Sequence, residues 1–297
     1  MALICYRERT FRPDSLARIE TANGIVDDYL GQGLRLTLRQ LYYQFVAHHG
    51  LPNTERSYKG LAALVSDARL AGLIDWDAIE DRGRQPDVPS DWSGIPSLVE
   101  SALRAYRLPR WDGQDNYVEL WVEKQALAGV LEPLAREFHV TLMVNKGYSS
   151  QSAMHEAAKR FIENGQGAER EPVLLYLGDH DPSGEDMVRD IGDRLAMFGV
   201  EDLDVRKLAL TMEQIEQYHP PPNPTKVTDS RAAGYIAKHG ASSWEVDALD
   251  PSQLAQLIRD EFVDLVDMRL LSRVRQREEA DKAKLKQMVA KGWRDDG

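Results

Sequence analysis

Cysteine is almost absent from this chain of 297 residues, in which Cys5 is the only one. An internal disulfide or a cysteine-rich zinc site is therefore excluded. Long apolar runs are missing too, and the N-terminus lacks the apolar core of a signal peptide. Neither a P-loop nor another ATPase motif is found. We expect a cytoplasmic protein, associated with the nucleoid if it is bacterial or archaeal, that contacts no membrane.

An excess of basic residues is also lacking. The 37 Lys and Arg residues are outnumbered by 48 Asp and Glu residues, which gives a formal charge of −11. Nonspecific nucleic-acid-binding proteins are typically basic, so the bulk charge does not indicate one. The charge is uneven, however, because residues 1–110 hold 14 basic and 14 acidic residues and residues 111–297 hold 23 and 34. If a nucleic acid is bound, the neutral N-terminal part should contact it, with metal ions at the acidic part.

The N-terminal part has the pattern of a small helical domain. Apolar periodicity and end signals predict helices over residues 13–30, over residues 38–49 and from Thr54 or Ser57 to residue 70, with a strand over residues 73–79. This order is typical of a winged helix-turn-helix module, which places one helix in the DNA major groove. We assign residues 1–90 to this domain. Residues 91–116 are assigned to a linker with one short helix, over 97–106.

From residue 117, predicted strands and helices alternate. The strands cover 117–122, 140–145, 172–178 and 203–210, and the helices cover 124–138, 151–163 and 184–198. This alternation predicts βαβ units and therefore an α/β fold with a mainly parallel sheet. We assign residues 117–265 to this domain. Residues 266–297 are highly charged and should form a C-terminal helix that is solvated or binds a partner.

Acidic residues follow two of the predicted strands. The apolar run at 174–177 leads into Gly-Asp-His-Asp-Pro-Ser-Gly at 178–184, and the strand over 117–122 leads into Glu123 and Lys124. The carboxyl ends of parallel strands are where α/β sheets bind ligands, and a divalent cation is the usual reason to keep like charges together. Glu123, Asp179 and Asp181 therefore form a candidate magnesium site. The alternative is a solvated acidic loop in which Asp179 or Ser183 caps the next helix.

His180 stands between the two aspartates. We expect it to be a solvent-facing residue at the strand end and not a metal ligand.

A tyrosine and an arginine form a second candidate site on the helix over residues 38–49. At about 100° per residue, the core stripe contains Leu38, Leu41, Tyr42 and Phe45. Arg39 and Tyr43 lie off that stripe and beside each other at spacing i, i+4. Tyr43 should therefore project outward with a guanidinium beside its hydroxyl. A phenol can attack a phosphodiester and a guanidinium can hold the phosphate, although an exposed Tyr–Arg pair is often incidental.

The chain resembles the A subunit of type IIB DNA topoisomerase (topoisomerase VI) and its relative, the meiotic double-strand-break transesterase. The resemblance is carried by T-L-R-Q-L-Y-Y at 37–43, V-E-K at 122–124, G-D-H-D-P-S-G at 178–184 and W-E-V-D-A-L at 244–249. These motifs follow the family's order and spacing over about residues 35–265, in a compact member.

The resemblance implies a winged-helix tyrosine domain followed by a Toprim domain. In that interpretation, Tyr43 is the nucleophile and Arg39 assists it, while Glu123, Asp179 and Asp181 bind Mg²⁺. The implied activity is Mg²⁺-dependent cleavage of double-stranded DNA, with a 5′-phosphotyrosyl intermediate and a free 3′-OH.

Partners are implied in the same way. Two protomers make one double-strand break in the family, with the tyrosine of one facing the metal site of the other, so a homodimer is expected. Strand passage would require a separate ATPase subunit of the GHKL type. Candidate phosphate contacts are Arg56, Lys59 and Arg69 on or beside the third helix, and Lys124 after the first strand.

Two other functions fit the same residues. A Toprim hydrolase would cleave nucleic acid with an activated water, and Tyr43 would then only contact DNA, because Toprim acids serve several chemistries. A winged-helix DNA-binding protein without catalysis is the third interpretation. The set of three carboxylates argues against it, since a pure binding protein does not need to hold them together.

Overall fold

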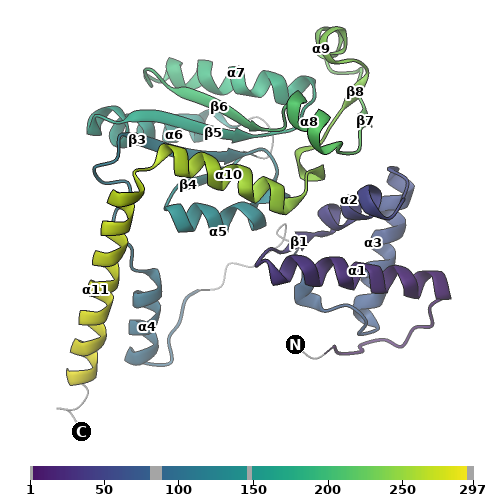
Figure 1. Ribbon diagram of the computed structural model, residues 1–297, viewed down its shortest axis with the longest axis horizontal. Helices are drawn as coiled ribbons and strands as arrows, with labels where there is room; N and C mark the ends of the chain where they lie inside the picture. The colour runs from purple at the N-terminus through teal and green to yellow at the C-terminus, as the bar shows by residue number, and fades with distance from the viewer. Residues whose placement is uncertain (1–2, 81–88, 146–148, 293–297) are drawn as a thin grey trace.

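The computed structural model describes residues 3–80, 89–145 and 149–292. Three helices build its N-terminal unit, α1 (Pro13–Gly31), α2 (Leu38–His48) and α3 (Glu55–Leu70), as the sequence predicts (Figure 1). Their starts have local causes. The Thr37 hydroxyl and the Gln40 side chain form a capping box at α2, and the Thr54 hydroxyl accepts from the Ser57 amide at α3.

The strand predicted over residues 73–79 is wrong for most of its length. A short 3₁₀ turn, η1 (Trp76–Ala78), begins where the Asp75 carboxylate accepts from the Asp77 amide. Only β2 (Ile79–Glu80) is extended, and it pairs in parallel with β1 (Leu36–Thr37). Residues 81–88, where a wing would continue, lie outside the described residues. The described part of this unit is therefore a helical unit with a two-residue parallel ladder.

A four-stranded parallel sheet forms the second unit, as predicted. Its order is β4 (Thr141–Val144), β3 (Asn116–Val122), β5 (Glu171–Leu177) and β6 (Asp204–Ala209). Val122 of β3 is paired with Leu177 of β5, so both strands end at the same level. The residues that follow them, Glu123 and Gly178, consequently leave the same edge of the sheet. The α/β class with a parallel sheet is confirmed.

Helices cover both faces of the sheet (Figure 1). One apolar core joins the sheet to α5 (Ala128–Phe138) and α10 (Pro251–Leu265). The other joins it to α6 (Gln151–Asn164) and α7 (Pro182–Met197). The central strands β3 and β5 are largely buried, which explains their apolar runs, whereas the edge strands β4 and β6 are partly exposed. The 3₁₀ turns η2 (Gln125–Leu127) and η3 (Gln166–Ala168) precede α5 and β5.

After β6 the chain makes an excursion and returns to the sheet edge. The excursion contains α8 (Met212–Tyr218), β7 (Asn223–Pro224), α9 (Ala232–His239) and β8 (Ser242–Ser243), of which the sequence pattern predicts none. Trp244 then forms a backbone bridge with His180. This bridge places η4 (Val246–Ala248) beside the ends of β3 and β5, where α2 also contacts it.

Two helices form an arm beside the sheet. α4 (Ile95–Ala105) lies along α11 (Met268–Gly292), the predicted charged C-terminal helix (Figure 1). The Tyr106 hydroxyl donates to Asp281, and Arg110 makes a buried ion pair with Glu278 at 2.9 Å. The segment assigned as a linker is thus fixed against α11 along its second half. Within the described residues, none of the helices combines the length and apolar character needed to cross a membrane.

Candidate functional site

Tyr42 and Tyr43 are both buried, at 4% and 2% exposure. The prediction that Tyr42 packs in the core is confirmed, and its hydroxyl bonds to the loop before α3 through the Thr54 amide. The prediction that Tyr43 projects into solvent is wrong. The second unit covers it, because the segment after β8 lies against α2.

The Tyr43 hydroxyl meets an acid far away in the sequence. It donates a hydrogen bond of 2.9 Å to Glu245 Oε2, and Arg39 Nη2 lies 3.5 Å from the phenolic oxygen. The same Arg39 nitrogen lies 2.6 Å from both oxygens of Glu245. The helix spacing that puts Arg39 beside Tyr43 is therefore confirmed, and Glu245 joins them into one cluster.

Lys124 occupies the centre of that cluster. Its ammonium lies 3.0 Å from Glu245 and 2.9 Å from each of Asp247 and Asp179. The predicted role of Lys124 as a phosphate contact is therefore not supported, because its donors already face three carboxylates. Asp247 is fully buried; its Oδ2 makes no hydrogen bond within the described residues but lies 3.5 Å from Arg39 Nε.

The predicted magnesium ligands are only partly brought together. Glu123 and Asp179 are neighbours, since the Asp179 amide donates to Glu123 Oε2 at 3.2 Å. Asp181 instead caps α7, where its Oδ1 accepts from the Gly184 amide at 2.7 Å and from the Ser183 hydroxyl. Among the residues that the structure describes, no three His, Cys, Asp or Glu side chains form a metal-holding group. The preformed three-carboxylate site is therefore not observed. The next helix is capped by a carboxylate, as the alternative expects, but the cap is Asp181 and not Asp179 or Ser183.

Glu123 and Asp179 nevertheless suit Mg²⁺ by the chemistry of their donors. Magnesium in phosphate-handling sites is commonly bound by one or two carboxylates, with water and substrate phosphate completing the octahedron. Asp179 accepts from the Val246 amide at 2.9 Å in addition to Lys124. Burial, together with the Glu123 and Asp247 charges, outweighs Lys124 and raises the Asp179 pKa to about 7.

The remaining pKa shifts describe a tightly coupled cluster. Burial and the nearby Asp247 and Glu245 charges raise the pKa of Tyr43. Burial favours the neutral form of Glu245, but the charges of Lys124 and Arg39 favour the ionised form more strongly and hold the Glu245 pKa at about 2. The phenol is therefore protonated and its acceptor ionised when Arg39 and Lys124 both remain in place.

His180 is buried, so the prediction of a solvent-facing residue is wrong. Its Nδ1 lies 2.7 Å from the Tyr235 hydroxyl, which also donates to the His180 carbonyl. Its backbone exchanges two hydrogen bonds with Trp244, at 2.9 and 3.0 Å. His180 thus ties the D-x-D turn to the excursion and holds the residue that follows Trp244, Glu245, near Lys124.

A pocket of about 210 Å³ opens beside the tyrosine. It is lined by Arg39, Tyr42, Tyr43, Asn53, Thr54, Glu55, Tyr58 and Asn223. Arg39 and Tyr43 are both among its lining residues. Asn53 also donates to the Pro222 carbonyl at 3.0 Å, so the excursion forms part of the rim.

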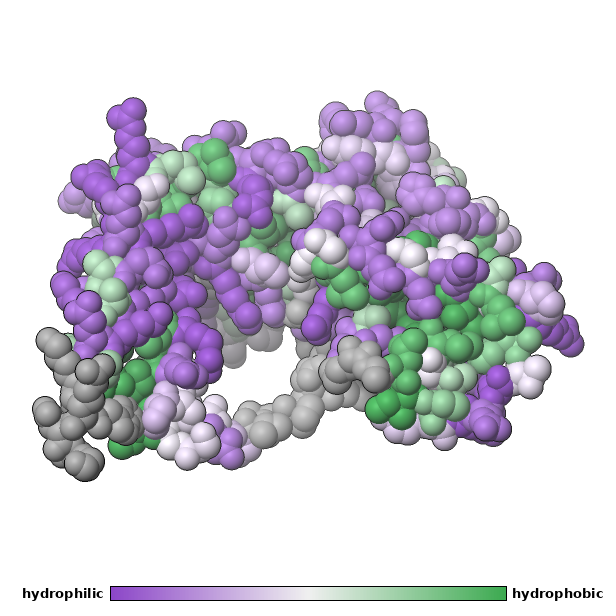
Figure 2. All heavy atoms as spheres, turned by 60° about the horizontal axis from the view of Figure 1, so that its bottom comes forward, coloured by the Kyte–Doolittle hydropathy of each residue, from purple (hydrophilic) through white to green (hydrophobic). Residues whose placement is uncertain are grey.

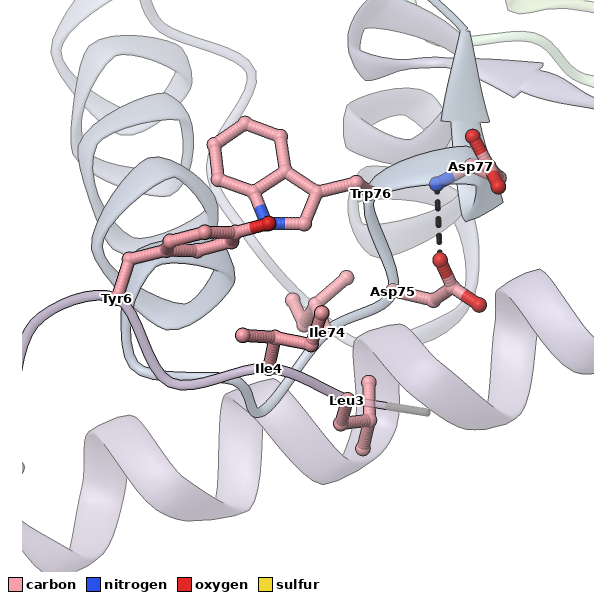
Figure 3. Close-up of a pocket in the computed structure, with 7 residues that line it drawn as sticks. All are labelled: Leu3, Ile4, Tyr6, Ile74, Asp75, Trp76 and Asp77. Carbon is pink, nitrogen blue, oxygen red and sulfur yellow. Dashed lines mark hydrogen bonds between the residues drawn. The ribbon is translucent and has the colours of Figure 1, made fainter. Parts of the chain in front are cut away.

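A second pocket, of about 270 Å³, belongs to the N-terminal unit and is mainly apolar (Figure 3). Leu3, Ile4, Tyr6, Ile74, Asp75, Trp76 and Asp77 line it. Figure 2 shows that this unit presents a broad apolar area. The Tyr6 and Trp76 rings meet edge to face, and Asp75 turns toward the Asp77 amide. Neither a guanidinium nor an ammonium is among these lining residues, and the two carboxylates, Asp75 and Asp77, have no cationic side chain beside them in the lining.

The other predicted phosphate contacts differ in their surroundings. Arg56 is exposed on the first turn of α3, and Lys59 is exposed but pairs with Glu55 at 2.7 Å. Arg69 instead donates to the backbone carbonyls of Trp76 and Ile79. Arg69 therefore stabilises the turn before β2, which corrects its prediction as a DNA contact.

Glu245 and Asp247 are the functional candidates that residue-level reasoning missed. They belong to W-E-V-D-A-L at 244–249, which contributes to the family resemblance but has no chemical signature of its own. The i, i+2 spacing of two acids before an apolar residue is the only local signal, and it resembles that of Asp179 and Asp181.

Comparison with protein-family models gives no match to this chain, and a search of curated proteins gives no significant match either.

Proposed function

We propose that this protein cleaves double-stranded DNA by tyrosyl transesterification, with Tyr43 as the nucleophile. The observation that carries the proposal is the hydrogen bond between the Tyr43 hydroxyl and Glu245, 2.9 Å long, beside the Arg39 guanidinium. A nucleophile, a carboxylate that accepts its proton and a cation for phosphate are thereby in one place. In this proposal the helical unit is the winged-helix tyrosine domain and the parallel sheet is the Toprim domain.

The reaction begins with an exchange at Arg39. A guanidinium binds phosphate through the same paired hydrogen bonds that it makes to a carboxylate. A backbone phosphate entering the pocket beside Tyr43 takes Arg39 from Glu245. Glu245 then loses one of the two cations that hold its pKa low and becomes a better proton acceptor.

The transesterification follows. The phenolic oxygen of Tyr43 attacks phosphorus, its proton passes to Glu245, and a new phosphotyrosyl bond forms. The bond from phosphorus to the 3′ oxygen breaks, and this oxygen takes a proton from water. Arg39 balances the charge on the phosphoryl oxygens. Lys124 stays between Glu245, Asp247 and Asp179 and keeps these acids in position.

Glu123 and Asp179 are the residues that would hold Mg²⁺. Mg²⁺ held by these two carboxylates would supply positive charge for the phosphate and for the leaving oxygen. A double-strand break needs one tyrosine for each strand, so the proposal includes a homodimer on double-stranded DNA. An ATPase subunit would be needed only for strand passage.

A covalent-trapping assay tests the proposal. The protein is incubated with end-labelled duplex and Mg²⁺ and quenched with denaturant, and protein-linked 5′ ends are measured. We expect adducts with the wild type and with Tyr106→Phe, a control tyrosine that bonds Asp281 on the arm, and none with Tyr43→Phe or Asp179→Ala. Free 5′ ends that survive Tyr43→Phe would instead identify a hydrolytic nuclease. Tight DNA binding without any broken strand, with and without added Mg²⁺, would favour a non-catalytic DNA-binding protein.

A further inference from the structure

The arm helix α11 differs in charge from the rest of the protein. Its 25 residues contain eight Lys and Arg and three Asp and Glu, a balance of +5 in a chain of −11. Its exposed basic side chains include Arg269, Arg273, Arg277 and Lys284. The helix is thus a local basic surface on an acidic molecule.

These four cations share one stripe. With 3.6 residues per turn, Arg269, Arg273, Arg277 and Lys284 fall within an arc of roughly 80° on the helix circumference. No acidic residue of the helix falls in that arc. Glu278 lies on the side that Leu271 buries, where it pairs with Arg110, and Glu279 lies on the opposite flank with Lys282.

Three of the four have no acidic partner in the described part of the chain. Elsewhere, exposed arginines are commonly paired, as Arg189 is with Asp186 and Asp193. By contrast, no carboxylate of the described residues lies within ion-pair distance of Arg269, Arg273 or Arg277, and Lys284 has only Asp281 at 3.6 Å. Unpaired like charges on one stripe repel one another, so an anionic ligand along the stripe would relieve that repulsion.

The stripe is also held rigidly. The Arg110–Glu278 pair is buried, and the Leu108 amide donates to the same carboxylate at 3.0 Å. Arg275, on the buried side, donates to the Glu137 carbonyl at 2.8 Å. These contacts fix α11 to the sheet unit and fix the side to which the stripe faces.

We propose that the α11 stripe binds the phosphate backbone of duplex DNA outside the cleavage site. Arg269 to Lys284 spans about 22 Å of helix, enough to follow several consecutive phosphates. Arginine predominates, and its planar guanidinium suits phosphate recognition. Figure 1 shows α11 at the opposite end of the molecule from α2, so the two surfaces would engage separate segments of one duplex. The identity of the polyanion as DNA rests on the proposed function.

The salt dependence of DNA binding tests this proposal. Arg269, Arg273 and Arg277 are changed together to Gln in a Tyr43→Phe background, which removes any covalent step. The slope of log K against log salt concentration should fall by up to about 2.7, at about 0.9 for each phosphate that the variant no longer neutralises. A control changes Arg136, Lys159 and Arg189 to Gln, three exposed cations that pair with acids on their own helices. It removes the same charge and should leave the slope nearly unchanged.

Two outcomes would overturn the proposal: equal slopes for the wild type and the α11 variant, or equal reductions in the α11 variant and the control. If the α11 variant loses self-association while its salt slope for DNA binding stays unchanged, the stripe would instead bind an acidic surface of another copy of the protein. The adduct assay separates this test from that of the proposed function. If the α11 variant reduces the slope but the wild type never forms adducts, DNA binding by α11 would be supported and the proposed transesterase activity would be rejected.

Discussion

Tyr43 donates its phenolic hydrogen bond to Glu245, which lies 202 residues further along the chain. This bond joins the helical unit to the sheet unit at the edge where β3 and β5 end. Arg39 and Lys124 hold the same carboxylate from either side, at 2.6 and 3.0 Å. The cluster therefore links the two units through the residues that the proposed chemistry uses.

Glu245→Gln should reduce adduct formation by about 100-fold, the usual effect of removing one preorganised catalytic group. The amide keeps the shape of the side chain but accepts a proton poorly. Rates of adduct formation at saturating DNA measure the effect. Glu261→Gln, which removes a carboxylate paired with Arg206 away from the cluster, is the control. An unchanged rate in Glu245→Gln would exclude Glu245 as the proton acceptor.

Mixing two inactive variants should not restore cleavage. The family resemblance implies that the tyrosine of one protomer faces the acids of its partner, whereas here Tyr43 contacts Glu245 within its own chain. If each chain holds its own complete site, a mixture of Tyr43→Phe and Asp179→Ala forms no adduct. In the exchanged arrangement, mixed dimers would have one intact site, and adducts would appear on the chain that retains Tyr43. Denaturing gels with differently sized tags distinguish the two results.

Lys124→Ala should destabilise the fold by about 3 kcal/mol. Removing one partner of a buried ion pair leaves uncompensated charge, and we take the lower end of the usual range because the Lys124 side chain is 22% exposed. Urea unfolding at pH 7 measures the free energy of unfolding. Lys159→Ala, at an exposed pair with Glu156, should cost less than about 1 kcal/mol. Similar reductions in the two variants would show that Lys124 does not stabilise the acid cluster.

The contribution of Glu278 to stability should depend on pH. Burial opposes its charge, but Arg110 and the Leu108 amide outweigh that effect and lower its pKa below the ordinary value of 4.5. A carboxyl with a lowered folded-state pKa stabilises the fold above its unfolded pKa, and this contribution fades as the pH falls through the folded value. Glu278→Gln should therefore lower the urea midpoint at pH 7 and have a smaller effect at about pH 3.5. An effect that does not change with pH would mean that the charge of Glu278 is not what stabilises α11.

The sheet could be predicted from the sequence because its signals are local. The central strands β3 and β5 are short, largely apolar runs that alternate with helices, and α6 begins at a serine cap, Ser150. The spacing of Arg39 and Tyr43 on α2 is local in the same sense. Periodicity and capping depend on neighbours within a few residues, so a single sequence is enough to predict them.

The surroundings of the site could not be predicted in this way. Tyr43 is buried by a segment 202 residues away, so its exposure depends on how the two units meet. Lys124 pairs with Asp247 across the sheet unit, a contact that the local sequence does not indicate. His180 is buried for a similar reason, because the excursion folds Tyr235 onto it. The sequence predicts Asp181 as a metal ligand, with Asp179 or Ser183 as the alternative helix cap, and only the geometry of its contact with Gly184 identifies Asp181 as the cap.

Both ends of the excursion after β6 are tied to the same turn. The Leu210 amide donates to the Gly178 carbonyl, and His180 and Trp244 exchange their backbone hydrogen bonds two residues later. Residues 211–243 therefore form a loop whose two ends, at Leu210 and Trp244, are held by these backbone hydrogen bonds whatever the length of the loop between them. Insertions or deletions near its tip, around residue 228, would leave Glu245 where it is. The protein can thus accept a new surface element at this point while the residues around Tyr43 keep their positions.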